Sequence, residues 1–234
     1  MHYKAHILHR DVSDGNIMYT KHDGADWFVL IDFDLAAKVD TQGMPLGATS
    51  RHCTGTLLYM DPTLLYDLAE MAKAHGQGQQ HAAQTALPHC VRFDFVSLFF
   101  VVLCIMIMGV GLEKDTADPN DLSYRKSTIQ LMEAGDYWSM AAVKAAYLTR
   151  WESLRDLSLS PTFAHLRGWL LAFSFPLSRD MQRRNEWIRD QDLQVVFGKM
   201  REPAAETFQQ IEMLHGEVTA QKILDSLNTY GEKK

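Results

Sequence analysis

The segment His9-Arg10-Asp11-Val12-Ser13-Asp14-Gly15-Asn16 is followed, after two short apolar runs, by Asp32-Phe33-Asp34. An aspartate on a loop can accept a proton from a hydroxyl nucleophile, so Asp11 is a candidate general base. Asn16 supplies a neutral oxygen, and Asp32 supplies an anionic one at the end of an apolar run. Converging Asn and Asp oxygens suit Mg²⁺, which binds few protein ligands together with substrate phosphates. The order and spacing of these residues are more specific than any one of them.

This combination resembles the C-terminal lobe of the protein kinases. The match is to the H-R-D-x-x-x-x-N catalytic loop at residues 9–16 and to the D-F-G metal-binding motif at residues 32–34. The sequence GTLLYMDPT at residues 55–63 looks like the G-T-x-x-Y-M-A-P-E segment that closes a kinase activation loop. The resemblance therefore implies an activation loop over residues 32–63.

Two further features extend the resemblance. Asp94-Phe95-Val96-Ser97 looks like the D-x-x-S start of the central kinase helix, which is expected to begin near residue 94. Ser13 in place of the usual Lys, the Gly15–Met18 run and the phenylalanines after Ser97 are most similar to the fungal-type protein kinases. We therefore interpret residues 1–234 as one protein kinase C-lobe, with its strong motifs within residues 9–97.

The resemblance implies a catalytic centre in which Asp11 is the base. Asn16 and Asp32 would bind Mg²⁺, and Asp32 would bridge the metal to the phosphates of ATP. Thr56 would bond near Asp11 and help to seat a Ser/Thr substrate. Arg10 would face a phosphate or an acidic group in the activation loop, because a guanidinium can hold phosphate through two hydrogen bonds.

Three residues are expected to support this centre. By resemblance, Asp94 would accept hydrogen bonds from the backbone of the catalytic loop and fix its shape. His9 and Phe33 would stack as part of the spine that joins the lobes of a kinase. The cofactors implied are ATP and Mg²⁺.

The sequence also departs from the family pattern. Asp34 replaces the third-position Gly of D-F-G, and Ser13 replaces a Lys that steadies the transferred phosphate. Asp61 and Thr63 replace the Ala and Glu of A-P-E, so the buried Glu–Arg pair that anchors this segment in most kinases is expected to be lost. Only eight residues precede His9, and none of them supplies a G-x-G-x-x-G loop or a V-A-I-K lysine. We therefore expect a C-lobe without its N-lobe, inactive by itself.

The expected fold is α+β and predominantly α, with a small β-hairpin at the catalytic loop. The hairpin strands are expected at Ile17–Tyr19 and Trp27–Ile31, around a turn that contains Gly24. A polar connector is expected at Asp115–Asp121. Helix-compatible spacing of apolar residues follows Pro62 and predicts helices at Leu64–Ala74, from about Asp94, and at Trp138–Leu154, Thr162–Phe173, Asn185–Met200 and Pro203–Tyr230.

The composition is that of an ordinary globular protein, with 47% hydrophobic and 22% charged residues. The formal net charge of −6 disfavours a large nucleic-acid surface, because phosphate neutralisation needs clustered positive charge. Three scattered cysteines are too few for a disulfide framework and suit a reducing compartment. We therefore expect an intracellular protein, cytoplasmic or nuclear, that does not bind nucleic acid.

One segment raises the question of a membrane. Residues 95–112 carry no charge and have the length of a spanning helix. By composition alone a helix buried in the centre of a domain is favoured over a membrane-spanning helix. In kinases the central helix is the buried post around which the C-lobe packs, so the resemblance implies a core helix and no membrane.

Two functions follow from the sequence. The first is a Ser/Thr protein kinase of the fungal type, whose partner is a protein substrate. The second is a non-catalytic kinase-like module that binds a partner protein. The presence of Asp11, Asn16 and Asp32 favours the enzyme, whereas the expected lack of an N-lobe favours the module.

Overall fold

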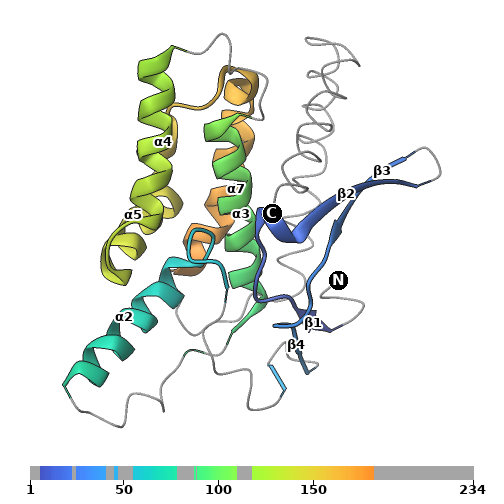
Figure 1. Ribbon diagram of the computed structural model, residues 1–234, viewed down its shortest axis with the longest axis vertical. Helices are drawn as coiled ribbons and strands as arrows, with labels where there is room; N and C mark the ends of the chain where they lie inside the picture. Colours follow the sequence, from blue (N-terminus) through green and yellow to red (C-terminus); the bar gives the residue numbers. More distant parts are fainter. Residues whose placement is uncertain are drawn as a thin grey trace.

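The computed structural model describes residues 6–22, 25–40, 45–46, 55–77, 87, 89–109 and 118–181. The helices predicted at Asn185–Met200 and Pro203–Tyr230 lie outside these residues. Figure 1 shows a group of helices on one side of the molecule and a β-hairpin that projects from the other side. The fold is therefore α+β and mostly α, as the sequence predicted.

The β structure consists of two small antiparallel sheets. Strand β1 (Ile7–Leu8) pairs with β4 (Ala37–Lys38), and β2 (Ile17–His22) pairs with β3 (Ala25–Leu30) in a regular hairpin. A 3₁₀ turn, η1 (Asp14–Asn16), leads directly into β2. The predicted hairpin is thus present. It places residue 16 just before its first strand and residue 32 just after its second.

The centre of the molecule is helix α3 (Val91–Met108), which begins three residues before Asp94. Its apolar residues lie on every side of the helix, so other elements must cover all of its faces. Phe99, Phe100, Leu103 and Ile107 are completely buried. The prediction of a buried central helix is confirmed.

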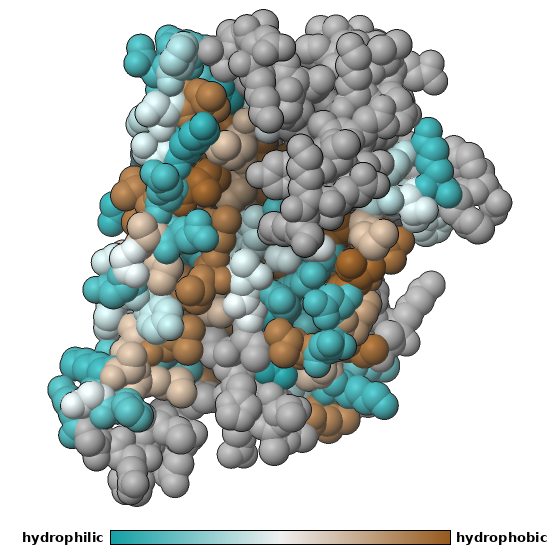
Figure 2. Space-filling model, in the orientation of Figure 1, coloured by the Kyte–Doolittle hydropathy of each residue, from teal (hydrophilic) through white to brown (hydrophobic). Residues whose placement is uncertain are grey.

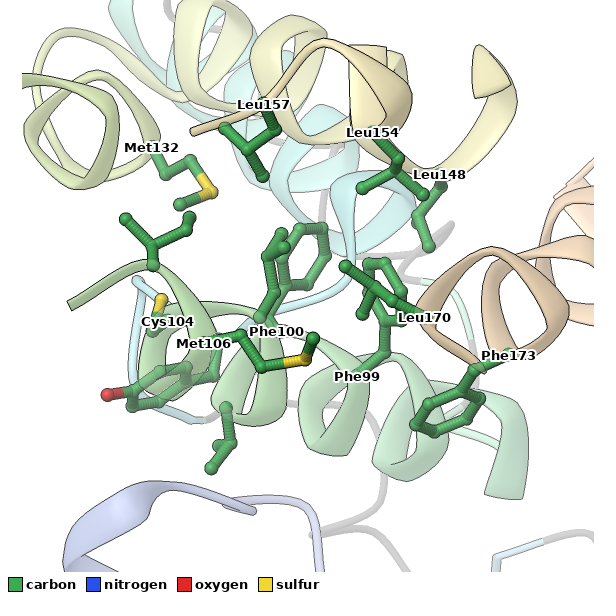
Figure 3. Close-up of a cluster of buried hydrophobic side chains, with 14 of the residues drawn as sticks. Phe99, Phe100, Cys104, Met106, Met132, Leu148, Leu154, Leu157, Leu170 and Phe173 are labelled. Atoms are coloured by element: carbon green, nitrogen blue, oxygen red, sulfur yellow. The ribbon is translucent and has the colours of Figure 1, made fainter. Parts of the chain in front are cut away.

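Figure 3 shows how this core is assembled, with Phe99 and Phe100 of α3 facing leucines from the surrounding helices. Those helices are α2 (Pro62–Gly76), α4 (Pro119–Glu133), α5 (Tyr137–Thr149), α6 (Trp151–Arg155) and α7 (Arg167–Met181), preceded by the 3₁₀ segment η4 (Pro161–Leu166). Helix α3 packs on α4 and α7, and α5 packs on α2 and α7. The core therefore lies between α3 and the later helices.

By length and composition α3 could also cross a membrane, with a mean hydropathy of 2.3 over its 18 residues. Within the structure, however, 61% of this helix is buried. Its apolar surface is largely used in packing against the other helices.

Three boundaries differ from the sequence prediction. Helix α4 begins inside the predicted connector Asp115–Asp121, because the Asp118 carboxylate caps the Asn120 amide at 2.8 Å and Pro119 fits the first helical turn. The helix was missed because its residues are mostly polar. The predicted helix Trp138–Leu154 is divided into α5 and α6 at Arg150, whose φ of −112° and ψ of 102° are extended. The predicted helix Thr162–Phe173 begins as the 3₁₀ segment η4 and extends to residue 181 as α7.

Candidate active site

Asp11 is held by residues from two different segments. The backbone amide and the Oγ1 hydroxyl of Thr56 donate to Asp11 Oδ1 at 2.8 and 2.9 Å. Asn16 Nδ2 donates to the backbone oxygen of Asp11 at 2.9 Å and lies 3.4 Å from its Oδ2. Two strong bonds on Oδ1 and one long contact on Oδ2 fix the carboxylate while leaving Oδ2 the better oxygen to accept a proton.

The loop that carries Asp11 is shaped by a carboxylate from the central helix. Asp94 accepts the backbone amide of His9 at 2.7 Å through Oδ2 and that of Arg10 at 2.8 Å through Oδ1. His89 Nε2 lies 3.3 Å from the same Oδ1. Arg10 has a φ of 71°, which is uncommon for a residue with a side chain. The two amide bonds to Asp94 hold the backbone in this conformation.

His9 connects the catalytic loop to the 32–34 segment. Its ring is fully buried, with Nε2 2.8 Å from the backbone oxygen of Ile31. The rings of His9 and Phe33 meet edge to face, with their centroids 4.9 Å apart. The contact between these two rings that was expected from the sequence is therefore present.

Asp32 is joined to the other site residues through the main chain. The Ile31 amide donates to the backbone oxygen of Asn16 at 2.9 Å, which holds the end of β3 beside the start of β2. Asp32 is exposed and has a φ of 60°, a left-handed conformation that Asp tolerates better than most residues. Backbone outliers of this kind cluster at functional sites, and two of them, at residues 10 and 32, flank this one.

The side-chain oxygens of Asn16 and Asp32 suit a hard cation whose other ligands come from bound molecules. Asn16 uses its Nδ2 on Asp11, which directs its Oδ1 away from that residue. The Asp32 carboxylate lies in solvent at the adjoining strand end. Within the described part of the chain, no three His, Cys, Asp or Glu side chains form a metal cluster. One amide and one carboxylate suit Mg²⁺ only if phosphates and water complete its coordination.

Arg10 is buried, with 5% of its surface exposed. Its expected partner, a phosphate or acidic group in the activation loop, falls largely on positions 41–44 and 47–54, outside the described residues. The role of Arg10 therefore stays a prediction.

The segment from Gly55 to Thr63 closes over the catalytic loop. Gly55 has a φ of 124°, and a Cβ at this position would lie 3.0 Å from the backbone oxygen of Arg10, so glycine permits the close approach. Residues 56–60 then form a turn in which the amides of Tyr59 and Met60 donate to the Thr56 oxygen at 2.9 and 3.0 Å. This turn brings Thr56 to Asp11.

A different buried acid–arginine pair is present in place of the Glu–Arg pair whose loss was expected. Asp61 Oδ2 lies 3.2 Å from Arg92 Nη2 of α3, and both side chains are buried. Asp61 Oδ1 also accepts the Thr63 amide at 2.6 Å and caps α2. An aspartate two residues before the expected glutamate position thus supplies a buried ion pair that ties this segment to the central helix.

Three residues near the site were not identified from the sequence: His89, Arg92 and Lys144. Lys144 donates from Nζ to the backbone oxygens of Leu57 and, at 3.2 Å, Met60. It lies in the alanine-rich run Ala141–Ala146, whose composition favours a helix and indicates no function. Its contacts join residues more than 80 positions apart, so no local sequence pattern predicts them.

The fold and the site define a mainly helical α+β protein with an Asp–Asn–Thr cluster held on a loop by its central helix. Residues 1–106 match the family model of the fungal protein kinases. This match covers less than half of the chain and supports the resemblance of its motifs to the fungal-type protein kinases. No curated protein and no solved structure matches the chain.

The contacts of Asp94 lead to a prediction. Asp94→Ala removes the acceptors of the His9 and Arg10 amides, and we expect the free energy of unfolding to fall by about 3 kcal/mol, because bonds to charged groups are strong and the donors are partly buried. Urea denaturation measures this change, and hydrogen exchange at both amides should accelerate.

The matched control is Asp136→Ala, which removes an exposed carboxylate that caps α5 by accepting the Ser139 amide at 2.7 Å. Loss of this exposed helix cap should lower the free energy of unfolding much less than loss of Asp94 does. Equal losses in the two variants, with unchanged exchange at residues 9 and 10, would show that Asp94 does not shape the loop.

Proposed function

We propose that this chain is the catalytic lobe of a Ser/Thr protein kinase of the fungal type, which transfers the terminal phosphoryl group of ATP to a protein hydroxyl. The observation that carries the proposal is the environment of Asp11. Thr56 and Asn16 orient its side chain, and Asp94 fixes the backbone on its N-terminal side. A base held in this way has the geometry that proton transfer from a hydroxyl requires.

In this proposal Asp11 Oδ2 accepts the proton of the substrate hydroxyl as the hydroxyl oxygen bonds to the terminal phosphorus of ATP, while the bond from that phosphorus to the bridging oxygen breaks and ADP leaves. Thr56 keeps the carboxylate turned toward the substrate and, being exposed, also lies where a Ser/Thr side chain would bind. Asn16 and Asp32 would hold Mg²⁺, which neutralises charge on the phosphates of bound ATP. Phosphoryl transfer depends mainly on such positioning and charge stabilisation.

The metal assignment predicts how Mg²⁺ binds. Mg²⁺ alone should bind weakly, because one carboxylate and one amide leave most of its octahedral positions to water. Addition of ATP should tighten binding, and Asp32→Ala should abolish that gain. Isothermal titration with Mg²⁺ in the presence and absence of ATP measures both effects. Tight binding of Mg²⁺ alone that survives Asp32→Ala would contradict the assignment.

A second function is favoured by the surface of the hairpin. Four of its large apolar side chains are about half exposed: Met18, Trp27, Phe28 and Val29. Met18 and Val29 are cross-strand partners and share one face, which Trp27 also occupies. Exposed apolar patches of this kind mark interaction surfaces. The hairpin would then bind a partner protein, and the chain would act as a non-catalytic kinase-like module.

The space-filling view shows the hydropathy of one face of the molecule. On the described part of the face in Figure 2, hydrophobic and hydrophilic residues lie interspersed. An N-terminal kinase lobe placed against the hairpin would cover its apolar side chains and also enclose ATP. A partner protein could cover the same side chains without restoring catalysis.

A radiolabelled-phosphate assay distinguishes the two. The 234 residues alone and their fusion to the N-terminal lobe of another fungal-type kinase are incubated with ATP, Mg²⁺ and a Ser/Thr substrate. We expect background transfer from the first and clear transfer from the fusion. A folded fusion that transfers no phosphate would favour the interaction module, whereas robust activity of the 234 residues alone would show that no further lobe is needed.

A further inference from the structure

Helix α5 carries a lysine that is entirely withdrawn from solvent. Lys144 is 0% exposed, and its Nζ lies 5.4 Å from the centre of the Phe100 ring of α3. The same Nζ donates to two backbone oxygens, those of Leu57 and Met60. A charged group is expensive to bury unless its hydrogen-bonding capacity is used, so these contacts account for the presence of a lysine here.

The two oxygens belong to the turn that carries Thr56. Within residues 56–60 the amides of Tyr59 and Met60 already donate to the Thr56 oxygen. Lys144 binds the carbonyl of Leu57, next to Thr56, and that of Met60, at the C-terminal end of the turn, in the way that a cation binds the last carbonyls of a helix. Asp11 lies at the other end of the turn, where it accepts both Thr56 bonds.

We propose that Lys144 is a positioning residue that fixes the 56–60 turn against α5 and so holds Thr56 on Asp11. The inference rests on the proposed function only in calling Asp11 the base. The coupling from Lys144 to Thr56 is a property of the contacts and can be measured without any phosphoryl transfer.

The chemical environment of Lys144 supports this role. Burial lowers its pKa to about 7, although the nearby groups Cys104 of α3, Asp61 of the segment before α2 and Glu133 of α4 all act to raise it. If the side chain at position 144 only filled space, an apolar side chain of similar length would serve as well. Retention of an amine at this cost points to the two carbonyls that it binds.

The test is residue-specific hydrogen exchange by NMR on the whole chain carrying Lys144→Met, which keeps an unbranched side chain one atom shorter and removes the donors. We expect exchange of the Thr56 amide to accelerate at least tenfold, with a smaller acceleration at Tyr59. Amides of β2 and β3 should exchange as in the parent protein. Replacing a buried charge by an apolar group can leave global stability unchanged or higher, which makes a local loss at Thr56 distinctive.

The control is Leu148→Ala, which removes packing from the next turn of the same helix without touching the carbonyls. It should accelerate exchange broadly rather than at Thr56 in particular. If Lys144→Met does not fold, Lys144→Gln, whose amide is one bond too short to reach both carbonyls, should show the same selective acceleration. The proposal is overturned if Thr56 exchange changes no more in the lysine variant than in Leu148→Ala.

The coupling from Lys144 to Thr56 and the kinase activity can fail independently. A selective change at Thr56 in a protein whose N-lobe fusion is inactive would keep the coupling and remove the kinase proposal. An active fusion, together with unchanged Thr56 exchange in Lys144→Met, would keep the kinase proposal and remove the coupling.

Discussion

Phosphate transfer by the N-lobe fusion is expected to fall by about 10²–10⁴-fold when Asp11 is replaced by Asn, the range that a positioned general base contributes. Asn preserves the size of the side chain and an oxygen that can accept the two Thr56 bonds. It cannot take up the proton of the attacking hydroxyl. The loss should appear in kcat rather than in the KM for ATP, because Asp11 does not bind the nucleotide in this mechanism.

Two further variants make the result specific. Asp32→Ala in the same fusion should also abolish transfer, but by weakening the binding of Mg²⁺ and ATP. Asp156→Asn is the matched control, since this exposed carboxylate pairs with the neighbouring Arg155. It should leave turnover unchanged. Turnover that survives Asp11→Asn would remove Asp11 as the base.

The predicted background activity of the 234 residues alone has a geometric origin. Nothing among them matches the loop that covers ATP or the lysine that holds its phosphates in kinases. A nucleotide held from one side loses orientation, and correct orientation can supply about 7–11 kcal/mol of barrier lowering. The fusion is therefore expected to gain activity through placement of ATP rather than through new catalytic groups.

Spacing alone predicted those parts of the site that lie close together along the chain, whereas the contacts of Thr56 with Asp11 and of Asp94 with the His9 and Arg10 amides were expected only from the family resemblance. Asp11 and Asn16 are separated by one short loop and a 3₁₀ turn, so their spacing alone brings them together. The hairpin likewise follows from two apolar runs around a turn. The apolar helix was recognised because its 18 residues have no polar face to expose.

Other features depend on contacts that no local pattern contains. The ion pair between Asp61 and Arg92 joins two segments that are well separated in the sequence. Helix α4 contributes few apolar residues, and its buried Arg125 reaches the Ile107 oxygen at the end of α3 at 3.3 Å. Polar residues that are buried by tertiary contacts look like surface residues in a sequence, which is why this helix was taken in part for a connector.

The Asp61–Arg92 pair itself should have a large effect on stability. Arg92→Met removes the guanidinium and leaves the Asp61 carboxylate buried without its ion-pair partner. Loss of one member of a buried pair typically costs about 3–5 kcal/mol, because the remaining charge is not compensated. We therefore expect the free energy of unfolding, measured by urea denaturation, to fall by that amount.

A double variant separates the charge from the packing. In Asp61→Asn with Arg92→Met the buried charge is gone, and the Asn side-chain oxygen can still cap α2 at the Thr63 amide. This protein should recover most of the stability that Arg92→Met loses. If the double variant is as unstable as the sum of the single ones, the stability comes from the packing of Arg92 on the Phe93 ring, which lies 5.6 Å from its guanidinium carbon, and not from the ion pair.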